Sequence, residues 1–489
     1  MQQQQNIKQK AISGLFWKLM ENGGTQGIAF LTSIVLARLI DPANYGVLSL
    51  TVIFTSIASV FVQRGFSLSL VQKKDADETD FSSVFYFSLV LALVLYLSLW
   101  ISAPWIADFY HTPQVKQVLR AISLILVFGA VTSVQNAIIM REMAFRQRFI
   151  ASVVSVVLSG TVGITMALLG FGVWALVAQQ LLDSLIMCVG LSIATGWFPK
   201  RLFSFKQLGG LFSFGWKLLV SSLLETIYSD VSGLIIGRRY SPAMLAHYDK
   251  GRKFPQLIGT NLSGAIQAAM FPTFSVAQDD HERLRAMVRR SVAISAFVTF
   301  PLIAGLGAVG TPLIRLVLTE KWMPCVPFLQ VFCITFALYP IDATVLQAIN
   351  ALGRSDLYLK LEIAKKIAGI LLIFAAVYWL DTPIALAWAL ALTAVLSVLL
   401  NAIPIKRLIG YRYGMQLRDL LPSIGLSIIM GTAVYAVSFL GFSDWLALCI
   451  QIPLGAVLYA GIAWIMKMES FTYLIKSMQE IRRRKRKVA

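Results

Sequence analysis

The chain has 489 residues, of which 57% are hydrophobic and only 14% are charged. An ordinary soluble domain has about 25% charged residues, so this composition excludes a soluble globular protein and predicts an integral membrane protein. The net charge of +19 would fit nucleic-acid binding in a soluble protein. In a membrane protein it indicates topology and contact with anionic lipid or an anionic substrate, and we expect no nucleic-acid partner.

About fourteen apolar stretches, each near the roughly 20 residues that a membrane-spanning helix needs, follow one another along the chain. The runs are continuous, without the strict alternation of barrel strands, so they predict an all-α membrane protein. The expected spans are 14–39, 45–68, 81–106, 117–139, 149–169, 172–195, 211–237, 253–275, 291–318, 326–350, 357–380, 383–404, 419–440 and 443–466. An even number of spans places both termini on one side.

Lysine and arginine decide which side that is. The segments on the same side as the termini carry 29 of these residues, and the opposite segments carry 10. This distribution predicts that both termini are cytoplasmic. Five of the ten opposite charges lie in residues 238–254, which include Arg238 and Arg252. They face either an anionic ligand or solvent, and both interpretations stay open.

An internal repeat of about 200 residues is visible in the sequence. Trp17-Lys18-Leu19 recurs as Trp216-Lys217-Leu218, and Arg38 to Ala43 recurs as Arg238 to Ala243. The repeat predicts two six-helix lobes related by a pseudo-two-fold axis, with two extra C-terminal helices. The expected parts are residues 1–200 for the first lobe, 201–410 for the second, and 411–489 for the extra helices and a polybasic cytoplasmic tail. Two such lobes are typical of a transporter with its site between them.

The first and seventh spans each carry a polar stripe at matching positions. The residues are Lys18, Asn22 and Gln26 in the first span, and Lys217, Ser221 and Glu225 in the seventh. A buried charge in a membrane costs at least about 2.5–3.5 kcal/mol unless it faces a wet cavity. We therefore expect the stripes to line a substrate cavity, with Glu225 as the first candidate for ion coupling. The alternative is that the uncharged members hold helices together.

Further charges lie in spans 7, 10 and 11. Glu362 and Lys366 are four residues apart, and Lys365 adds a second cation beside them. The two lysines either line the cavity or reach toward the membrane surface. Asp230, Asp342 and Glu362 are further candidates for ion coupling, although either aspartate could equally pair with a nearby arginine.

Several kinds of site find no support in the sequence. There is no phosphate-binding Walker motif, no spacing of His and Cys that predicts a metal site, and no long outside loop that could hold a catalytic domain. We therefore expect no catalytic residues, no cofactor and no metal, and a protein that is not an enzyme.

The chain resembles the Wzx-type polysaccharide flippases, in the superfamily that also holds the MATE exporters and the lipid II flippases. The resemblance is closest to exporters of colanic-acid-like or teichuronic-acid-like acidic polysaccharides. The segments that carry it are ISGLFWK (12–18), VLARLIDPANYGVLSL (35–50), VQKKDADETD (71–80), REMAF (141–145), FGVWALVAQQ (171–180), FPTFSVAQDDHERL (271–284), LTEKWMPCVPFLQ (318–330) and ALGRSDLYLK (351–360).

The resemblance implies a flippase that moves an undecaprenyl-pyrophosphate-linked, acidic oligosaccharide across the cytoplasmic membrane of a bacterium by alternating access. Its partners would be that lipid-linked substrate, anionic membrane lipids, and a polysaccharide polymerase with assembly proteins. The nearest alternative is a MATE-like exporter of drugs or of another lipid-linked precursor. A membrane polymerase and an assembly scaffold are the remaining alternatives. The lysines of the predicted cavity favour an anionic cargo over the cationic drugs of the first alternative.

Overall fold

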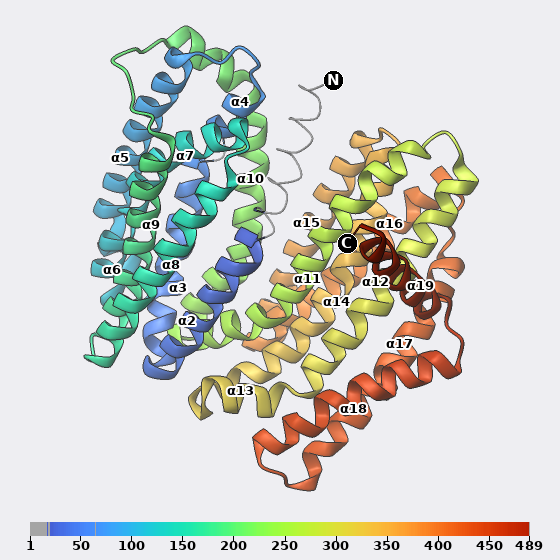
Figure 1. Cartoon of the computed structure of the whole chain (residues 1–489). Coiled ribbons are helices and arrows are strands. Elements are labelled where there is room, and N and C mark those ends of the chain that lie inside the picture. Colours follow the sequence, from blue (N-terminus) through green and yellow to red (C-terminus); the bar gives the residue numbers. More distant parts are fainter. Residues whose placement is uncertain (1–16, 18–19, 64, 489) are drawn as a thin grey trace. The chain divides into compact units, whose positions relative to one another are not determined.

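The computed structural model describes Trp17, residues 20–63 and residues 65–488. All regular structure in this part of the chain is helical (Figure 1). Eleven of its helices are long and apolar enough to cross a membrane, judged by length and composition alone. The protein is therefore an all-α multi-pass membrane protein.

Three of the fourteen expected spans are not among the eleven. Span 14–39 begins outside the described residues and continues as the π-helical turn η1 and the short helix α2. Spans 253–275 and 357–380 both form as helices, within α11 and α15. The first carries one charged side chain, Lys253, among many uncharged polar residues, and the second carries four charged side chains. All three segments are thus at least partly helical, and a total of fourteen spans stays a prediction that is compatible with this structure.

The chain forms two compact units, Met1–Ala246 and His247–Ala489. The helical elements of the first unit are η1 Glu21–Thr25, α2 Gln26–Leu39, α3 Pro42–Gln63, α4 Gly65–Gln72, α5 Glu78–Phe109, α6 Gln114–Ile122, α7 Ile125–Glu142, α8 Phe145–Leu168, α9 Val173–Thr195 and α10 Phe205–Arg239. Helix α10, the first helix of the expected second lobe, packs against α3, α4 and α5. The division by contacts therefore falls about one helix later than residue 200, where the sequence repeat begins.

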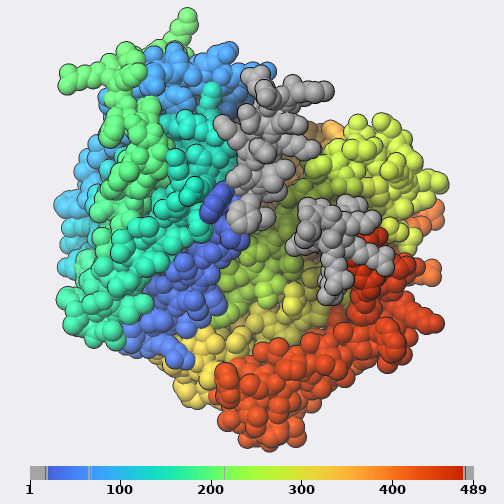
Figure 2. Space-filling model, viewed as in Figure 1, coloured from blue at the N-terminus to red at the C-terminus, as the bar shows by residue number. Residues whose placement is uncertain are grey.

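The second unit begins inside α11 Pro242–Val276. Its other elements are α12 His281–Ala308, α13 Gly310–Leu318, η2 Glu320–Cys325, α14 Val326–Ala351, α15 Ser355–Trp379, α16 Pro383–Ile409, α17 Tyr413–Ala436, η3 Val437–Leu440, α18 Asp444–Ile465 and α19 Glu469–Val488. Helix α14 packs on α12 and α16, and α15 packs on α16. Helix α18 packs on α13 and α17 and lies at the surface of the unit (Figure 2). It exposes Trp445, Ile452 and Trp464. Such an apolar surface is expected of a helix that faces lipid.

The two copies of the sequence repeat come together inside the first unit. The motif that starts at Arg38 leads into α3, and its copy at Arg238 leads into α11. A Cβ atom at Gly46 of α3 would overlap the backbone of Pro242, the first residue of α11. Only glycine allows so close an approach of two helix backbones. The repeat thus marks a point where two related helix starts pack directly on each other.

Candidate functional site

A cluster of charged and polar side chains lies inside the second unit, on three neighbouring helices. The amine of Lys365 on α15 lies 3.3 Å from the carboxylate of Asp342 on α14 and 3.1 Å from that of Glu362. Helix α16 completes the cluster, because Ser397 and Asn401 each donate a hydrogen bond of 2.6 Å to Asp342. The side chain of Lys365 is only 8% exposed. Three of the residues predicted as site residues therefore meet at one place.

This geometry bears on the alternatives that the sequence left open for span 11. The amine of Lys365 does not reach outward, since it is buried between two carboxylates. Asp342 pairs with this lysine instead of an arginine. Lys366, the next residue, is partly buried and makes contacts of its own. The cluster places two carboxylates beside a buried cation and is held together by ion pairing and hydrogen bonds. The role of these acids in ion coupling stays a prediction.

A second carboxylate site lies in the first unit. Asp230 of α10 is partly buried and accepts a 2.9 Å hydrogen bond from Ser56 of α3 and one of 3.2 Å from Ser229. The two hydroxyl donors satisfy part of the hydrogen-bonding capacity of this partly buried carboxylate. Asp230 thus joins α10 to α3, and sequence reasoning did not identify its partner Ser56.

The structure describes only some members of the polar stripes of spans 1 and 7. Lys18 lies outside the described residues, and so does the side chain of Asn22. The remaining members, Gln26, Lys217, Ser221 and Glu225, are all exposed at the surface of the first unit. Exposure of charged and polar groups on membrane helices is what a wet passage requires. Their role as cavity residues stays a prediction.

The basic segment 238–254 places its cations in different surroundings. Arg238 is exposed, and its guanidinium lies 4.9 Å from the ring centre of Phe109. Arg252 is partly buried within the second unit and has contacts there. Lys250, one turn of helix away from His247, lies 5.6 Å from the ring centre of Trp322. The stretch is therefore at least partly occupied by contacts within the protein.

Burial lowers the pKa of Lys250 to about 8, from an ordinary value near 10.5, with a smaller contribution from the nearby charge of Lys253. Folding therefore lowers the pH at which the amine loses its proton. Below pH 8 the amine is charged in the folded and in the unfolded protein, so the full cost of burying the charge lowers the free energy of unfolding. This cost disappears as the pH rises from about 8 to 10.5, because the amine is then neutral in the folded protein. We expect Lys250→Met to raise the midpoint of thermal unfolding at pH 7 and to raise it less at pH 10.

The matched control is Lys116→Met, which removes an exposed lysine of α6. It should leave the midpoint nearly unchanged at both pH values. Thermal unfolding of the purified protein measures both variants. An equal gain for Lys250→Met at pH 7 and pH 10 would contradict the assignment of a buried, titrating amine.

Two polar contacts in the first unit, an ion pair and a hydrogen bond, were not identified from the sequence. Arg148, counted only as a topological charge, pairs with Glu21 at 2.8 Å, and the side chain of Glu21 is only 8% exposed. Asp183 on α9 accepts a 2.6 Å hydrogen bond from Ser155 on α8. Neither contact follows a helical period, so no sequence pattern reveals it. The one signal in the sequence for a tertiary contact was that Asp183 is a lone acid within an apolar run.

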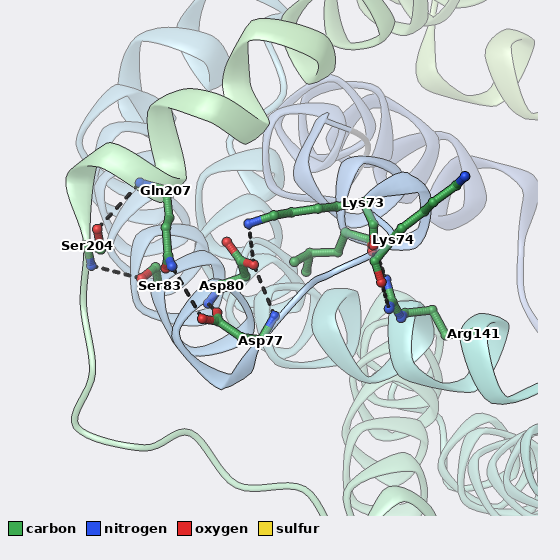
Figure 3. Close-up of polar contacts among 9 residues, drawn as sticks. Lys73, Lys74, Asp77, Asp80, Ser83, Arg141, Ser204 and Gln207 are labelled. Carbon is green, nitrogen blue, oxygen red and sulfur yellow. Dashed lines mark hydrogen bonds and ion pairs between the residues drawn. The ribbon is translucent and has the colours of Figure 1, made fainter.

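The segment VQKKDADETD, which carries part of the family resemblance, makes close polar contacts with two other segments of the first unit (Figure 3). We call this contact region the junction. Arg141 at the end of α7 donates hydrogen bonds to the carbonyl oxygens of Leu70, Lys73 and Lys74 at 2.5–3.0 Å. Asp80 is fully buried and lies 2.5 Å from the amine of Lys73. The motif and the arginine of REMAF thus act together to fix the α4–α5 connection.

The same junction holds the connection between α9 and α10. The hydroxyls of Ser82 and Ser83 accept hydrogen bonds from the backbone N–H groups of Lys200 and Ser204. Asp77 caps α5 by accepting from the N–H of Asp80, and this hydrogen bond lowers the pKa of Asp77. Figure 3 shows Ser204 and Gln207 turned toward this cap. The chain that leads into α10 is therefore anchored to the start of α5.

Metal binding finds no support in the described part of the chain. Among these residues no group of three or more His, Cys, Asp or Glu side chains is placed to hold a metal ion. The clusters around Asp342 and Asp230 each combine acids with hydroxyl or amine donors. The contacts that these residues make are ion pairs and hydrogen bonds.

Comparison with solved structures defines the class of fold. The lipid II flippase MurJ in an inward closed conformation superposes with a TM-score of 0.75 at 16% identity, over 92% of this chain and 98% of that chain. An inward-facing multidrug MATE transporter superposes with a TM-score of 0.61 at 16% identity, over 78% of this chain and 95% of that one. The chain has the all-helical membrane fold that these two proteins share.

Residues 35–327 match the family described as polysaccharide biosynthesis proteins. The chain therefore belongs to this family, and the resemblance to Wzx-type flippases is confirmed. It is 24% identical to a succinoglycan biosynthesis transport protein of Rhizobium meliloti, over 69% of this chain and 68% of that protein. It is 22% identical to a lipopolysaccharide biosynthesis protein of Escherichia coli over 74% of each, and 23% identical to a teichuronic acid biosynthesis protein of Bacillus subtilis over 83% and 85%.

Proposed function

We propose that the protein is a flippase that moves an undecaprenyl-pyrophosphate-linked oligosaccharide from the cytoplasmic to the outer leaflet of the bacterial cytoplasmic membrane. The observation that carries this proposal is the family match over residues 35–327, together with the flippase fold over 92% of the chain. A relative named as a succinoglycan transport protein supports transport over synthesis. The protein is then not an enzyme, and its direct partner is the lipid-linked substrate.

The physical problem that such a protein solves is the passage of sugar hydroxyls and a pyrophosphate across hydrocarbon. Each polar group that loses its hydrogen bonds there costs several kcal/mol. The exposed polar residues of α10, among them Lys217, Ser221 and Glu225, provide replacement partners on a membrane helix. We propose that Lys18 and Lys217 favour an acidic oligosaccharide, and that access alternates between the two sides of the membrane.

Energetics permit this passage without a coupled ion. A membrane potential of about 100 mV, negative inside, favours outward movement of each negative charge by about 2.3 kcal/mol. The charge distribution of the loops favours a cytoplasmic position for both termini, and we propose a polysaccharide polymerase and assembly proteins as further partners on that side.

Ion coupling through Glu225 is a separate part of the proposal. Glu225 lies on the exposed polar side of α10, two turns from Lys217. If Glu225 carries protons during the cycle, Glu225→Gln should remove the dependence of export on the pH gradient. Export is measured in cells at several external pH values. The control Glu142→Gln, an exposed acid at the end of α7, should keep the wild-type dependence; an unchanged dependence in both variants would leave Glu225 a structural residue.

Deletion of the gene tests the proposed function in the cell. The expected result is loss of the exported polysaccharide and accumulation of the lipid-linked oligosaccharide on the cytoplasmic face. Accumulation on the outer face would assign the protein to a later step. Normal export together with increased sensitivity to cationic drugs would favour the MATE-like exporter instead.

A further inference from the structure

A pocket of about 490 Å³ lies inside the second unit between α11, α12 and the first turns of α19. The floor of the pocket is apolar and includes Met270 of α11 and Met287 and Ile294 of α12. Arg283 and Arg290 also line the pocket, and because both arginines are exposed we call them its rim. The pocket therefore combines an apolar floor with a cationic rim.

The two rim arginines are available to an external anion. Neither forms an ion pair with a carboxylate in the part of the chain that the structure describes. Arg290 stacks on the ring of Tyr473 at 5.3 Å, which holds its guanidinium at the pocket edge. The neighbouring Arg289 is different, because two of its three guanidinium nitrogens, Nε and Nη2, donate to Asp419 at 2.9 and 2.7 Å.

An adjoining pocket of about 620 Å³ extends the same rim. It shares Arg290 and Tyr473 with the first pocket and adds Lys467 and Lys476. Its two acids are Asp419, which is bound to Arg289, and Glu469. Cations therefore outnumber the acids around the joined pockets, so the pair of pockets is suited to a negatively charged group.

The position of the pockets favours a lipid over a soluble anion. Helix α12 is among the eleven helices apolar enough to cross a membrane, and the arginines lie in its first three turns. Helix α19 packs on α12 (Figure 1). Its Phe471 and Leu474 pack against the apolar core of the unit. A basic amphipathic helix in such a place lies at the membrane surface, where anionic headgroups gather.

We propose that the joined pockets bind one anionic phospholipid of the surrounding leaflet, with its phosphate between Arg283 and Arg290 and an acyl chain along Met270, Met287 and Ile294. The flipped cargo fits less well. Apart from the arginines, the first pocket offers few groups that could form hydrogen bonds with sugars. Among these few groups, the hydroxyl of Ser291 already donates to the sulfur of Met270. This lipid site uses none of the residues proposed to contact the cargo and does not depend on the proposed function.

The test measures thermal stabilisation of the purified, delipidated full-length protein by added lipid. Dioleoyl phosphatidylglycerol should raise the unfolding midpoint in a saturable manner, and dioleoyl phosphatidylcholine should not. Arg283→Gln/Arg290→Gln should weaken the apparent affinity for phosphatidylglycerol at least tenfold. Ala286→Trp, which fills the space that both pockets share without changing charge, should weaken it to a similar degree.

The charge-matched control is Lys116→Gln/Arg201→Gln, which removes two exposed cations of the first unit and should bind as the wild type does. Equal stabilisation by both phospholipids, or full affinity in the arginine variant, would overturn the proposal. Stabilisation by glycerol phosphate alone would reassign the site to a soluble anion, and stabilisation by undecaprenyl phosphate but not phosphatidylglycerol would reassign it to the cargo.

Discussion

Replacing Lys365 by methionine is expected to destabilise the second unit by about 3 kcal/mol, because removal of one member of a buried ion pair leaves the other uncompensated. Two carboxylates, Asp342 and Glu362, lose their shared cation. They are 22% and 26% exposed, so hydration offsets part of the loss and the effect stays near the lower end of the range. A fall of roughly 6–12 °C in the midpoint of thermal unfolding corresponds to this value.

Two further variants make this prediction specific. Lys360→Met removes an exposed lysine from the same helix and should change stability by less than about 0.5 kcal/mol. Adding Asp342→Asn to Lys365→Met should recover part of the loss, because the second substitution removes one of the stranded charges. Equal midpoints for Lys365→Met and Lys360→Met would show that the cluster contributes nothing to the fold.

Gly46→Ala is expected to destabilise the first unit by about 3 kcal/mol, the upper part of the range for overpacking. A Cβ atom at this position would overlap the backbone of Pro242, which cannot move aside as a flexible side chain would. The contact joins the two copies of the repeat, so we also expect export to fall. Thermal unfolding and export, measured with the same variant, check both results.

Gly209→Ala is the matched control. Gly209 also lies in a helix, in the first turns of α10, and no atom would lie within 4 Å of a Cβ there. Alanine should therefore stabilise this helix by up to about 1 kcal/mol. A Gly46→Ala protein as stable as the Gly209→Ala protein would mean that α3 and α11 do not approach as closely as described.

The helical architecture could be predicted because long apolar runs leave few structural choices in a membrane. The repeat was also visible, since Trp, Arg and Pro recur at a nearly constant offset. The sequence did not show that the two copies of the motif pack on each other at Gly46 and Pro242. Nor did it show that α10 joins the first compact unit. Both facts depend on tertiary packing.

The candidate site was predictable only in part, and for a similar reason. Asp342 and Lys365 were recognised because each is a charge within an apolar run, but the hydrogen bonds from Ser397 and Asn401 come from a helix more than 50 residues away. The pairing of Arg148 with Glu21 went unnoticed because arginine near a span end already has an explanation in topology. When the local sequence already explains why a charged side chain is present, nothing in the sequence indicates its tertiary partner.

The most direct test of the central claim is translocation by the purified protein in lipid vesicles. Lipid-linked oligosaccharide is incorporated into both leaflets, and a membrane-impermeant glycosidase is added outside. If the protein is a flippase, the glycosidase should cleave only the outer half of the oligosaccharide in protein-free vesicles. It should cleave nearly all of the oligosaccharide when the protein is present. Cleavage that stops at the outer half in vesicles with correctly folded protein would contradict the assignment of the protein as a flippase.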